Sequence, residues 1–161
     1  MGKRYQDYVF KDGVFVGEFE KMYSNSDTIP WHQDKTAYSL TSDIDIAIIK
    51  KYVNNDCFNI VHLGCGLGYF TNRLKNEIPN KKVFGIDISK NEIDKANKLF
   101  DGINFHQLNI LTDNPSKFER IKQEGVDLIV IREILWYVVD EIQLFMKNLS
   151  KMLNGGEIIL S

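Results

Sequence analysis

"NIVHLGCGLGYFTNRL", residues 59–74, joins a short apolar run to a helical pattern through three alternating glycines, Gly64, Gly66 and Gly68. Glycine has no Cβ atom, so such a loop can turn tightly and a ligand can lie against its bare backbone. The helix that follows adds its positive N-terminal end, which favours an anionic group. The stretch therefore predicts a ligand-binding loop between a strand and a helix.

Strand and helix patterns alternate along the chain on both sides of this loop. Apolar runs predict strands at 58–63, 82–88, 103–110, 126–131 and from 157 onward. Helical patterns predict helices at about 44–52, 68–78, 90–100, 115–124 and 140–153. This alternation predicts an α/β fold, a Rossmann-like doubly wound parallel sheet. The run VDLIVI is typical of a strand that is buried on both faces.

Caps and apolar spacing predict where the helices begin and which of their faces pack. Ser89 and Glu92 form a capping box that opens one helix. The residues expected to pack together are Ile44, Ala47, Ile48 and Tyr52 behind the caps Thr41 and Ser42, then Ile93, Ala96 and Phe100, and finally Ile142, Phe145, Leu149 and Met152. Asn154-Gly155-Gly156 is expected to end the last of these helices.

Residues 1–41 are irregular and aromatic, and we expect them to form a lid on a core domain of residues 42–161. YVFKDGVFV predicts two short strands around an Asp12-Gly13 turn. GEFEKMY predicts a short helix with Phe19, Met22 and Tyr23 on one face, and a loop with Pro30 follows.

The composition indicates one soluble domain and argues against several kinds of partner. The 161 residues are 43% hydrophobic and 26% charged, with a net charge of −2. This balance gives no electrostatic footprint for nucleic acid or an acidic membrane surface. Cys57 and Cys65 are expected to be reduced thiols, which favours a cytoplasmic protein. His32, His62 and His106 show no metal-ligand spacing.

The glycine spacing separates one ligand class from others. The dinucleotide fingerprint would need a glycine where Tyr69 stands, and no Lys-Ser/Thr pair completes a phosphate loop. The G-x-G-x-G pattern instead resembles motif I of class I S-adenosylmethionine-dependent methyltransferases. Asp87, "HQLNIL", "VDLIVIREILWYV" and "LSKMLNGGEIIL" follow in that family's order, so the resemblance extends from about residue 42 to the end.

The resemblance implies S-adenosylmethionine as cofactor and a set of residues around it. Asp87 would accept both ribose hydroxyls, Asn109 would pair with the adenine edge, and Ile88 and Ile110 would sandwich the ring or simply belong to the core. The cofactor residues implied are Gly64, Cys65, Gly66, Gly68, Asp87, Ile88, Asn109, Ile110 and Arg132, with Tyr23 and Trp31 from the lid. His62 departs from the pattern, because the family commonly has there an acid that helps to bind the methionine amino group.

"IREILWYV" and "FEKMY…PW" resemble the small-molecule branch typified by nodulation N-methyltransferases. This implies methyl transfer to O or N of a small polar metabolite. A more distant resemblance, to methyltransferases of capsule gene clusters, would imply a sugar or a phosphoramidate group. Glu133 and His32 are candidate bases, although Glu133 would also suit a helix start. Trp31, Tyr23, Trp136 and Tyr137 would form an aromatic cage or pack in the core.

Two other function classes remain open at this point. A catalytically inactive scaffold for a protein partner would fit His62 and the end of the chain within the fifth predicted strand. A nicotinamide-dependent oxidoreductase is disfavoured by Tyr69. An apolar strand at the sheet edge would leave backbone groups unpaired, so we expect a truncated polypeptide, a homo-oligomer or an additional chain that covers the edge.

Overall fold

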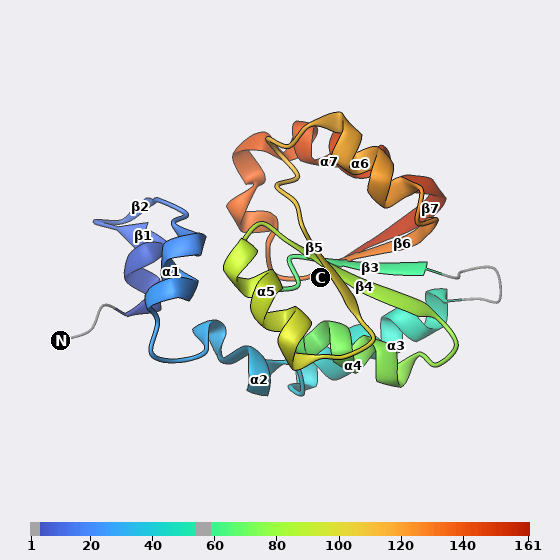
Figure 1. Cartoon of the computed structure of the whole chain (residues 1–161), viewed down its shortest axis with the longest axis horizontal. Helices are drawn as coiled ribbons and strands as arrows, with labels where there is room; N and C mark the ends of the chain where they lie inside the picture. The colour runs from blue at the N-terminus through green and yellow to red at the C-terminus, as the bar shows by residue number, and fades with distance from the viewer. Residues whose placement is uncertain (1–3, 54–58) are drawn as a thin grey trace.

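The computed structural model describes residues 4–53 and 59–161 and contains one parallel sheet with helices on both faces (Figure 1). Before the sheet come η1 (Tyr5–Tyr8), β1 (Phe10–Lys11), β2 (Val14–Phe15), α1 (Phe19–Asn25), η2 (Pro30–His32), α2 (Gln33–Thr36) and α3 (Leu40–Tyr52). The first two strands pair only with each other, in antiparallel orientation. Cys57, expected to be a reduced thiol, and Phe58, expected to begin the strand at 58–63, lie outside the described residues.

The sheet and its helices alternate as the sequence predicts. In chain order they are β3 (Asn59–Leu63), α4 (Tyr69–Glu77), β4 (Lys82–Asp87), α5 (Lys90–Leu99), β5 (Asn104–Gln107), α6 (Pro115–Lys122), β6 (Val126–Ile131), η3 (Leu135–Tyr137), η4 (Val139–Glu141), α7 (Ile142–Ser150) and β7 (Leu153–Leu160). All strand pairs are parallel, in the spatial order β5-β4-β3-β6-β7. The α/β Rossmann-like prediction is confirmed.

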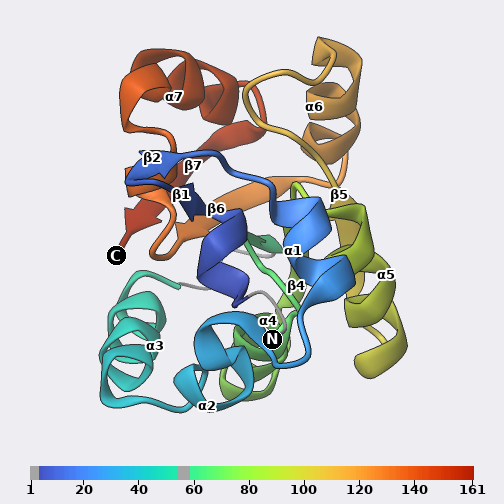
Figure 2. The same cartoon turned by 90° about the vertical axis from the view of Figure 1, so that its left-hand side faces the viewer.

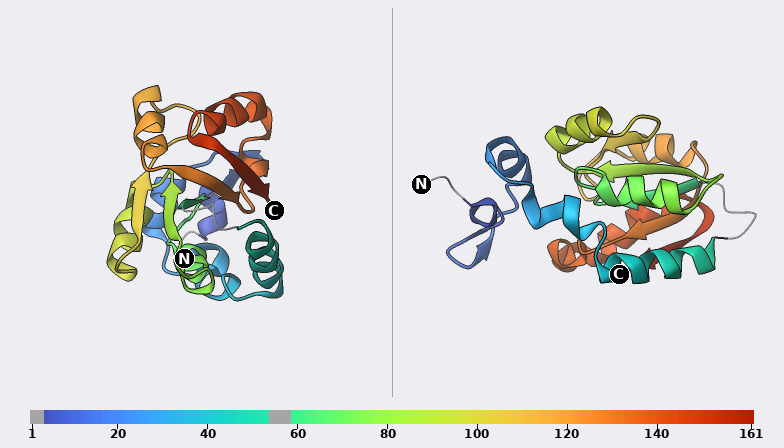
Figure 3. Two further views of the ribbon diagram at one scale, coloured as in Figure 1. Left: turned by 90° about the vertical axis from the view of Figure 1, so that its right-hand side faces the viewer. Right: turned by 90° about the horizontal axis from the view of Figure 1, so that it is seen from below.

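Two hydrophobic layers hold the helices on the sheet. On one face α6 and α7 contribute Phe118, Ile121, Phe145 and Leu149, which pack on Val61, Phe84 and Ile129. On the other face α3 and α4 contribute Ile46, Ile49, Phe70 and Leu74, which pack on Ile60, Val83 and Leu128. Figures 1 and 3 show the two groups of helices on opposite sides of the sheet. Strand side chains alternate between the two layers, as a sheet buried on both faces requires.

Helix α3 differs from the prediction in its start and in its buried face. Its N-cap is Ser39, whose hydroxyl accepts the Ser42 N–H, so neither Thr41 nor Ser42 is the cap. Ile44 and Ile48 are exposed, whereas the buried positions include the polar residue Asp45. The apolar spacing failed here because the buried side of α3 carries an ion-paired aspartate, which a hydrophobic pattern does not register.

The last strand also begins earlier than predicted. Gly155 and Gly156 lie inside β7, where the pairing with β6 shifts register between Val126 and Leu128. A Cβ on Gly156 would meet the Asp127 carbonyl oxygen at 1.9 Å, so this glycine allows two strands to approach at a bulge. Helix α7 is correspondingly shorter than predicted, and Ile142 at its start, which was expected to pack with Phe145, is exposed.

The segment before α3 lies beyond the carboxyl ends of the sheet strands, where Figure 2 shows it in front of them. Asp12 and Gly13 have φ angles of 51° and 79°, which confirms the predicted hairpin turn. The Glu20 carboxylate accepts hydrogen bonds from the Ser89 hydroxyl at 2.7 Å and from Asn91 Nδ2 at 2.8 Å. Through these contacts α1 is attached to the first turn of α5.

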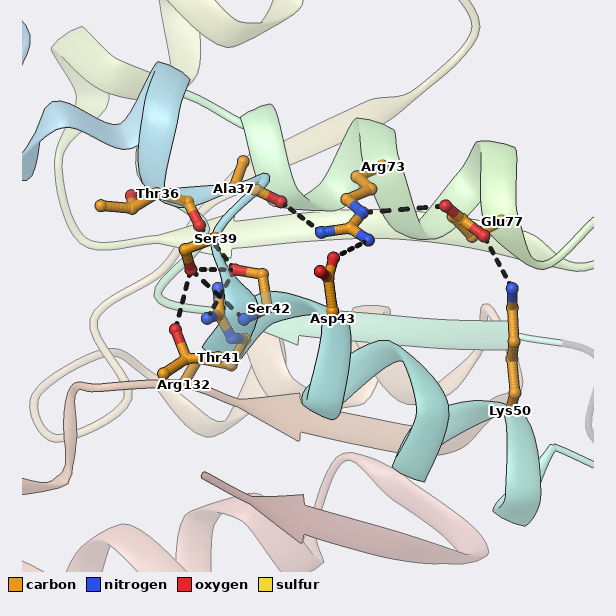
Figure 4. Close-up of polar contacts among 10 residues, drawn as sticks. All are labelled: Thr36, Ala37, Ser39, Thr41, Ser42, Asp43, Lys50, Arg73, Glu77 and Arg132. Carbon is orange, nitrogen blue, oxygen red and sulfur yellow. Dashed lines mark hydrogen bonds and ion pairs between the residues drawn. The ribbon is translucent and has the colours of Figure 1, made fainter.

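A second polar cluster joins the end of this segment to α3 and α4 (Figure 4). The Arg73 guanidinium donates to the Ala37 carbonyl at 2.9 Å and to Asp43 at 2.6 Å. The Ser42 hydroxyl donates to the Thr36 carbonyl at 2.6 Å. The end of α2 and the residue after it are therefore fixed to the core domain by Ser42 of α3 and Arg73 of α4.

Candidate functional site

A cavity of about 650 Å³ lies between the N-terminal segment and the carboxyl ends of β3, β4 and β6. Ligand pockets of small molecules typically measure roughly 300–1,000 Å³. The chain runs from β3 to β4 and β5 on one side of the sheet and to β6 and β7 on the other. The cavity thus occupies the point where the strand order reverses, which is where open α/β sheets bind ligands.

The glycine loop forms the floor of this cavity. The N–H groups of Gly64 and Cys65 both donate to the Ile86 carbonyl, at 2.8 and 3.0 Å, and so fix the loop to β4. A Cβ on Gly66, whose φ is 53°, would meet the Gln33 side-chain amide at 2.4 Å. Gly68 differs, because it is the N-cap of α4 and packs against Phe105 rather than lining the cavity.

Asp87 lines the cavity at the end of β4 and is buried. Its Oδ2 accepts the Gly66 N–H and its Oδ1 accepts the Ser89 N–H, both at 2.9 Å. Burial raises the pKa of this carboxyl, and the two backbone donors act in the opposite direction. Asp87 therefore connects the glycine loop to the start of α5 while it faces the cavity.

The predicted adenine residues line one end of the cavity. Ile88 is 43% exposed and offers an open apolar surface, whereas Ile110 is buried in the main core. The Asn109 Oδ1 accepts the N–H groups of Leu111 and Thr112, so it closes its own turn. Only the amide nitrogen of Asn109 then remains to meet a ligand.

His62 on β3 also lines the cavity and is buried, with 3% of its surface exposed. Its Nδ1 is 2.9 Å from the Thr71 hydroxyl, and its ring packs against Phe70. Burial, and to a smaller degree the charge of Arg132, lowers the pKa of His62 from 6.5 to about 3. The imidazole is consequently neutral at physiological pH.

Arg132 also lines the cavity, and its charge is already compensated. Its Nε donates to Asp45 at 2.6 Å and its Nη2 to Ser42 at 3.0 Å. Its guanidinium stacks over the Phe70 ring, 3.9 Å from the centroid. The ion pair joins the residue that follows β6 to α3, both of which flank the site.

Gln33 and Glu92 also line the cavity, and neither was predicted from the sequence to be a site residue. The Gln33 Oε1 accepts the Leu67 N–H at 2.7 Å, and its Nε2 donates to the Tyr23 hydroxyl and to Glu92, each at 3.2 Å. Glu92 was expected to complete a capping box. Ser89 does accept the Glu92 N–H, but the Ser89 N–H donates to Asp87, and the Glu92 side chain lines the cavity instead.

Aromatic side chains cover the cavity from the N-terminal segment and η3. Trp31 lies 6.1 Å from Tyr23 and 6.4 Å from Tyr137 between ring centroids, and Tyr137 stacks on Trp136 at 3.9 Å. The four residues expected to form a cage or to pack in the core therefore do lie together around the cavity. Trp31 has a φ of 52°, in the left-handed region that residues other than glycine rarely adopt.

The two candidate bases have different positions. Glu133 follows β6 with a φ of 53° and lines the cavity next to the aromatic cover. Its charge is one of the causes, after burial and Tyr5, that raise the pKa of the Tyr137 hydroxyl. His32 is not among the residues that line the cavity in the described part of the chain.

Comparison with known proteins agrees with this geometry. A family model described as a methyltransferase domain matches residues 54–161, which is more than half of the chain. The chain belongs to this methyltransferase family. It is 30% identical over 105 residues to malonyl-[acyl-carrier protein] O-methyltransferase 1 of Ilyobacter polytropus, covering 65% of this chain and 37% of that protein. The chain spans less than half the length of the curated relatives that it matches.

Solved structures of methyltransferases share the fold. A S-adenosylmethionine-dependent methyltransferase from Anabaena variabilis superposes with a TM-score of 0.72 at 21% identity, covering 88% of this chain and 59% of that one. Magnesium protoporphyrin IX methyltransferase from Synechocystis, solved with bound S-adenosylmethionine, gives a TM-score of 0.59 at 17% identity. It covers 96% of this chain and 72% of that one. The class I methyltransferase resemblance is thereby confirmed.

The cofactor of this methyltransferase family is S-adenosylmethionine, and the residues of the cavity fit it. The glycine loop presents bare backbone that a Cβ would fill, and a buried carboxylate stands at the end of β4. No group of three metal-ligating side chains occurs in residues 4–53 and 59–161. None of the helices described is long and apolar enough to cross a bilayer.

Proposed function

We propose that this methyltransferase transfers a methyl group from S-adenosylmethionine to an oxygen or nitrogen of a small polar metabolite. The observation that carries the proposal is the single cavity that extends from the glycine loop and Asp87 to the aromatic cover of Trp31 and Tyr137. Its size suits a cofactor beside a small acceptor, so the two could be held there in one relative orientation. Orientation of this kind can supply roughly 7–11 kcal/mol of the barrier in favourable cases.

In the proposed reaction, a lone pair on the acceptor atom forms the new bond to the methyl carbon. S-adenosylmethionine would supply the methyl group, with the electron pair of the broken carbon–sulfur bond left on sulfur. A hydroxyl acceptor also has to release a proton, and we assign its removal to Glu133, which is among the residues that line the cavity. The cofactor end is assigned to the predicted residues that line the cavity, which are Gly64, Cys65, Gly66, Asp87, Ile88, Asn109, Ile110 and Arg132, with Tyr23 and Trp31.

The acceptor that we propose is a sugar or a capsule-polysaccharide precursor, including a phosphoramidate. Besides the two carboxyls at the cofactor end, the Glu133 carboxylate lines the cavity, and the arginine of the cavity is already paired with Asp45. This charge distribution favours a sugar hydroxyl or amine over an anionic group, so sugars come first in the order of trial. A cytoplasmic location is proposed as well, since Cys65 is a free thiol.

The test measures methyl transfer to a panel of sugars, amino sugars, nucleotide sugars and phosphoramidates by mass spectrometry. The Glu133→Gln and His32→Ala variants accompany the wild type. We expect Glu133→Gln to lower kcat for a hydroxyl acceptor by roughly 10²–10⁴-fold, without change in S-adenosylhomocysteine affinity, and His32→Ala to keep full activity. Cofactor binding without transfer to any acceptor would favour the inactive scaffold instead.

We also propose that a second copy or another chain covers the outer edge of β7. Within the described residues β7 pairs only with β6, and α3 nearby exposes Leu40, Ile44, Ile48 and Tyr52. Figures 2 and 3 show the end of β7 and α3 on the same side of the molecule. Light scattering combined with intact mass tests this proposal, and a stable active monomer of 18.7 kDa would contradict it.

A further inference from the structure

The Glu92 carboxyl is the buried group whose environment the fold alone leaves unexplained. It is 1% exposed in the first turn of α5, and it lines the cavity. Its Oε1 accepts a hydrogen bond from Gln33, whereas Oε2 has no hydrogen-bond partner within the described part of the chain. Leaving a buried polar atom unpaired typically costs about 1–3 kcal/mol, and more when it carries charge.

The carboxyl is held in place from several sides. Gln33 donates to it while also bonding to the Leu67 N–H of the glycine loop and to the Tyr23 hydroxyl. The role that a capping-box glutamate would have at the Ser89 N–H is taken by Asp87. Glu92 is therefore oriented toward the cavity by side chains of α1 and α2 and has no task in its own helix cap.

Asp87 stands beside Glu92 and is already used by the protein. Both of its oxygens accept backbone N–H groups, from Gly66 and Ser89. The two carboxyls also interact, since burial and the charge of Asp87 raise the pKa of Glu92. A ligand with two neighbouring hydroxyls would find in this pair two carboxyl groups instead of one, and a hydroxyl can bond to either protonation state of Glu92.

We propose that Glu92 is a second ribose-binding residue of the cofactor site, with its Oε2 hydrogen-bonded to one of the two ribose hydroxyls. Asp87 then meets the other hydroxyl, and Gln33 and Tyr23 position Glu92. The proposal rests on the cofactor of the family and is independent of which acceptor is methylated. It explains why an acidic residue stands buried and half-paired at this place in the cavity wall.

The test combines a change in the protein with a change in the ligand. Calorimetry measures binding of S-adenosylhomocysteine and of its 2′-deoxy and 3′-deoxy analogues to the wild type, Glu92→Met and Glu92→Gln. We expect Glu92→Met to weaken S-adenosylhomocysteine binding by about 10-fold or more, the range of a hydrogen bond to a charged group. Glu92→Gln should restore most of the affinity. Asp94→Met, on the exposed side of the same helix, is the matched control.

The decisive readout is the coupling between the two changes. Loss of one hydroxyl should weaken binding to the wild type but have little further effect on Glu92→Met. If Glu92→Met weakened the binding of S-adenosylhomocysteine and of both deoxy analogues by the same factor, Glu92 would have a merely structural role. Binding of S-adenosylhomocysteine to Glu92→Met with unchanged affinity would also overturn the proposal. Thermal unfolding checks the fold, since removal of a buried carboxyl that has one unpaired oxygen and one bond from Gln33 should leave the melting temperature of the free protein little changed. Methyl transfer is measured separately, so failure of the acceptor assignment is distinguishable.

Discussion

The side-chain oxygen of Gln33 accepts the backbone N–H of Leu67 at 2.7 Å, and this bond joins the N-terminal segment to the glycine loop. The two residues are 34 positions apart in the chain. The contact is close because Gly66, next to Leu67, has no Cβ atom. The absent side chain therefore serves a protein contact as well as the approach of a ligand.

The first prediction concerns this glycine. Gly66→Ala should weaken S-adenosylhomocysteine binding by about 10-fold or more, because the new Cβ displaces the Gln33 amide and fills the cavity floor. Gly155→Ala is the control, since Gly155 also has a positive φ but nothing lies within 4 Å of a Cβ placed there. Backbone strain should cost both variants roughly 1–2 kcal/mol of stability. Gly66→Ala should lose more, because Gln33 is displaced from Leu67, and only this variant should lose affinity in calorimetry.

The second prediction concerns pH and His62. The unfolded chain binds a proton at this residue below about pH 6.5, whereas the folded protein resists it until about pH 3. The unfolded state therefore binds more protons in this window, and stability falls as the pH falls. At pH 5 the loss relative to pH 7 should be roughly 2 kcal/mol at 1.36 kcal/mol per unit.

His62→Gln keeps a polar partner for Thr71 but cannot titrate. Urea unfolding between pH 4 and pH 7 measures the difference in free energy of unfolding between the wild type and His62→Gln. Asp87 and Glu92 change stability in the opposite direction, but both proteins contain them, so their effect cancels in this difference. Burial raises the pKa of these carboxyls, so their own contribution to stability is lost as the pH rises. Parallel pH profiles for the two proteins would show that His62 is not held neutral.

The third prediction concerns the ion pair of Arg132 and Asp45, whose side chains are 10% and 11% exposed. Asp45→Leu should destabilise the fold by about 3–5 kcal/mol, because it leaves a buried guanidinium unpaired. The double variant Asp45→Leu/Arg132→Met should recover most of that loss. Chemical denaturation of the two single variants and the double variant completes the cycle, and additive losses would argue against direct coupling.

The fourth prediction concerns the attachment of α1 to α5. Glu20→Ala removes the acceptor for Ser89 and Asn91 and should increase amide hydrogen exchange throughout α1. Lys21→Ala is the control in the same helix, since its ammonium contacts Glu18. Exchange that rises equally in both variants would indicate a general effect on the helix.

Most of the fold could be predicted from local patterns, and part of the site could not. The glycine loop, Asp87 and the alternation of strands carry short-range signals, so their places were found. The buried face of α3 was predicted wrongly because Asp45 is buried through an ion pair with Arg132, 87 residues away. Gln33 was missed for the same reason, because nothing near it in the sequence indicates a contact with Leu67.

The junction of α1 with the first turn of α5 has a kinetic consequence. Ser89 contacts both elements, because its hydroxyl donates to Glu20 and its backbone N–H donates to Asp87. Glu92, in the same turn, lines the cavity. Anything that binds better when α1 is attached must strengthen that attachment by an equal factor. The spent cofactor would then leave slowly until α1 detaches, so the residence time of the product and the opening rate of the N-terminal segment should change together across variants of Glu20.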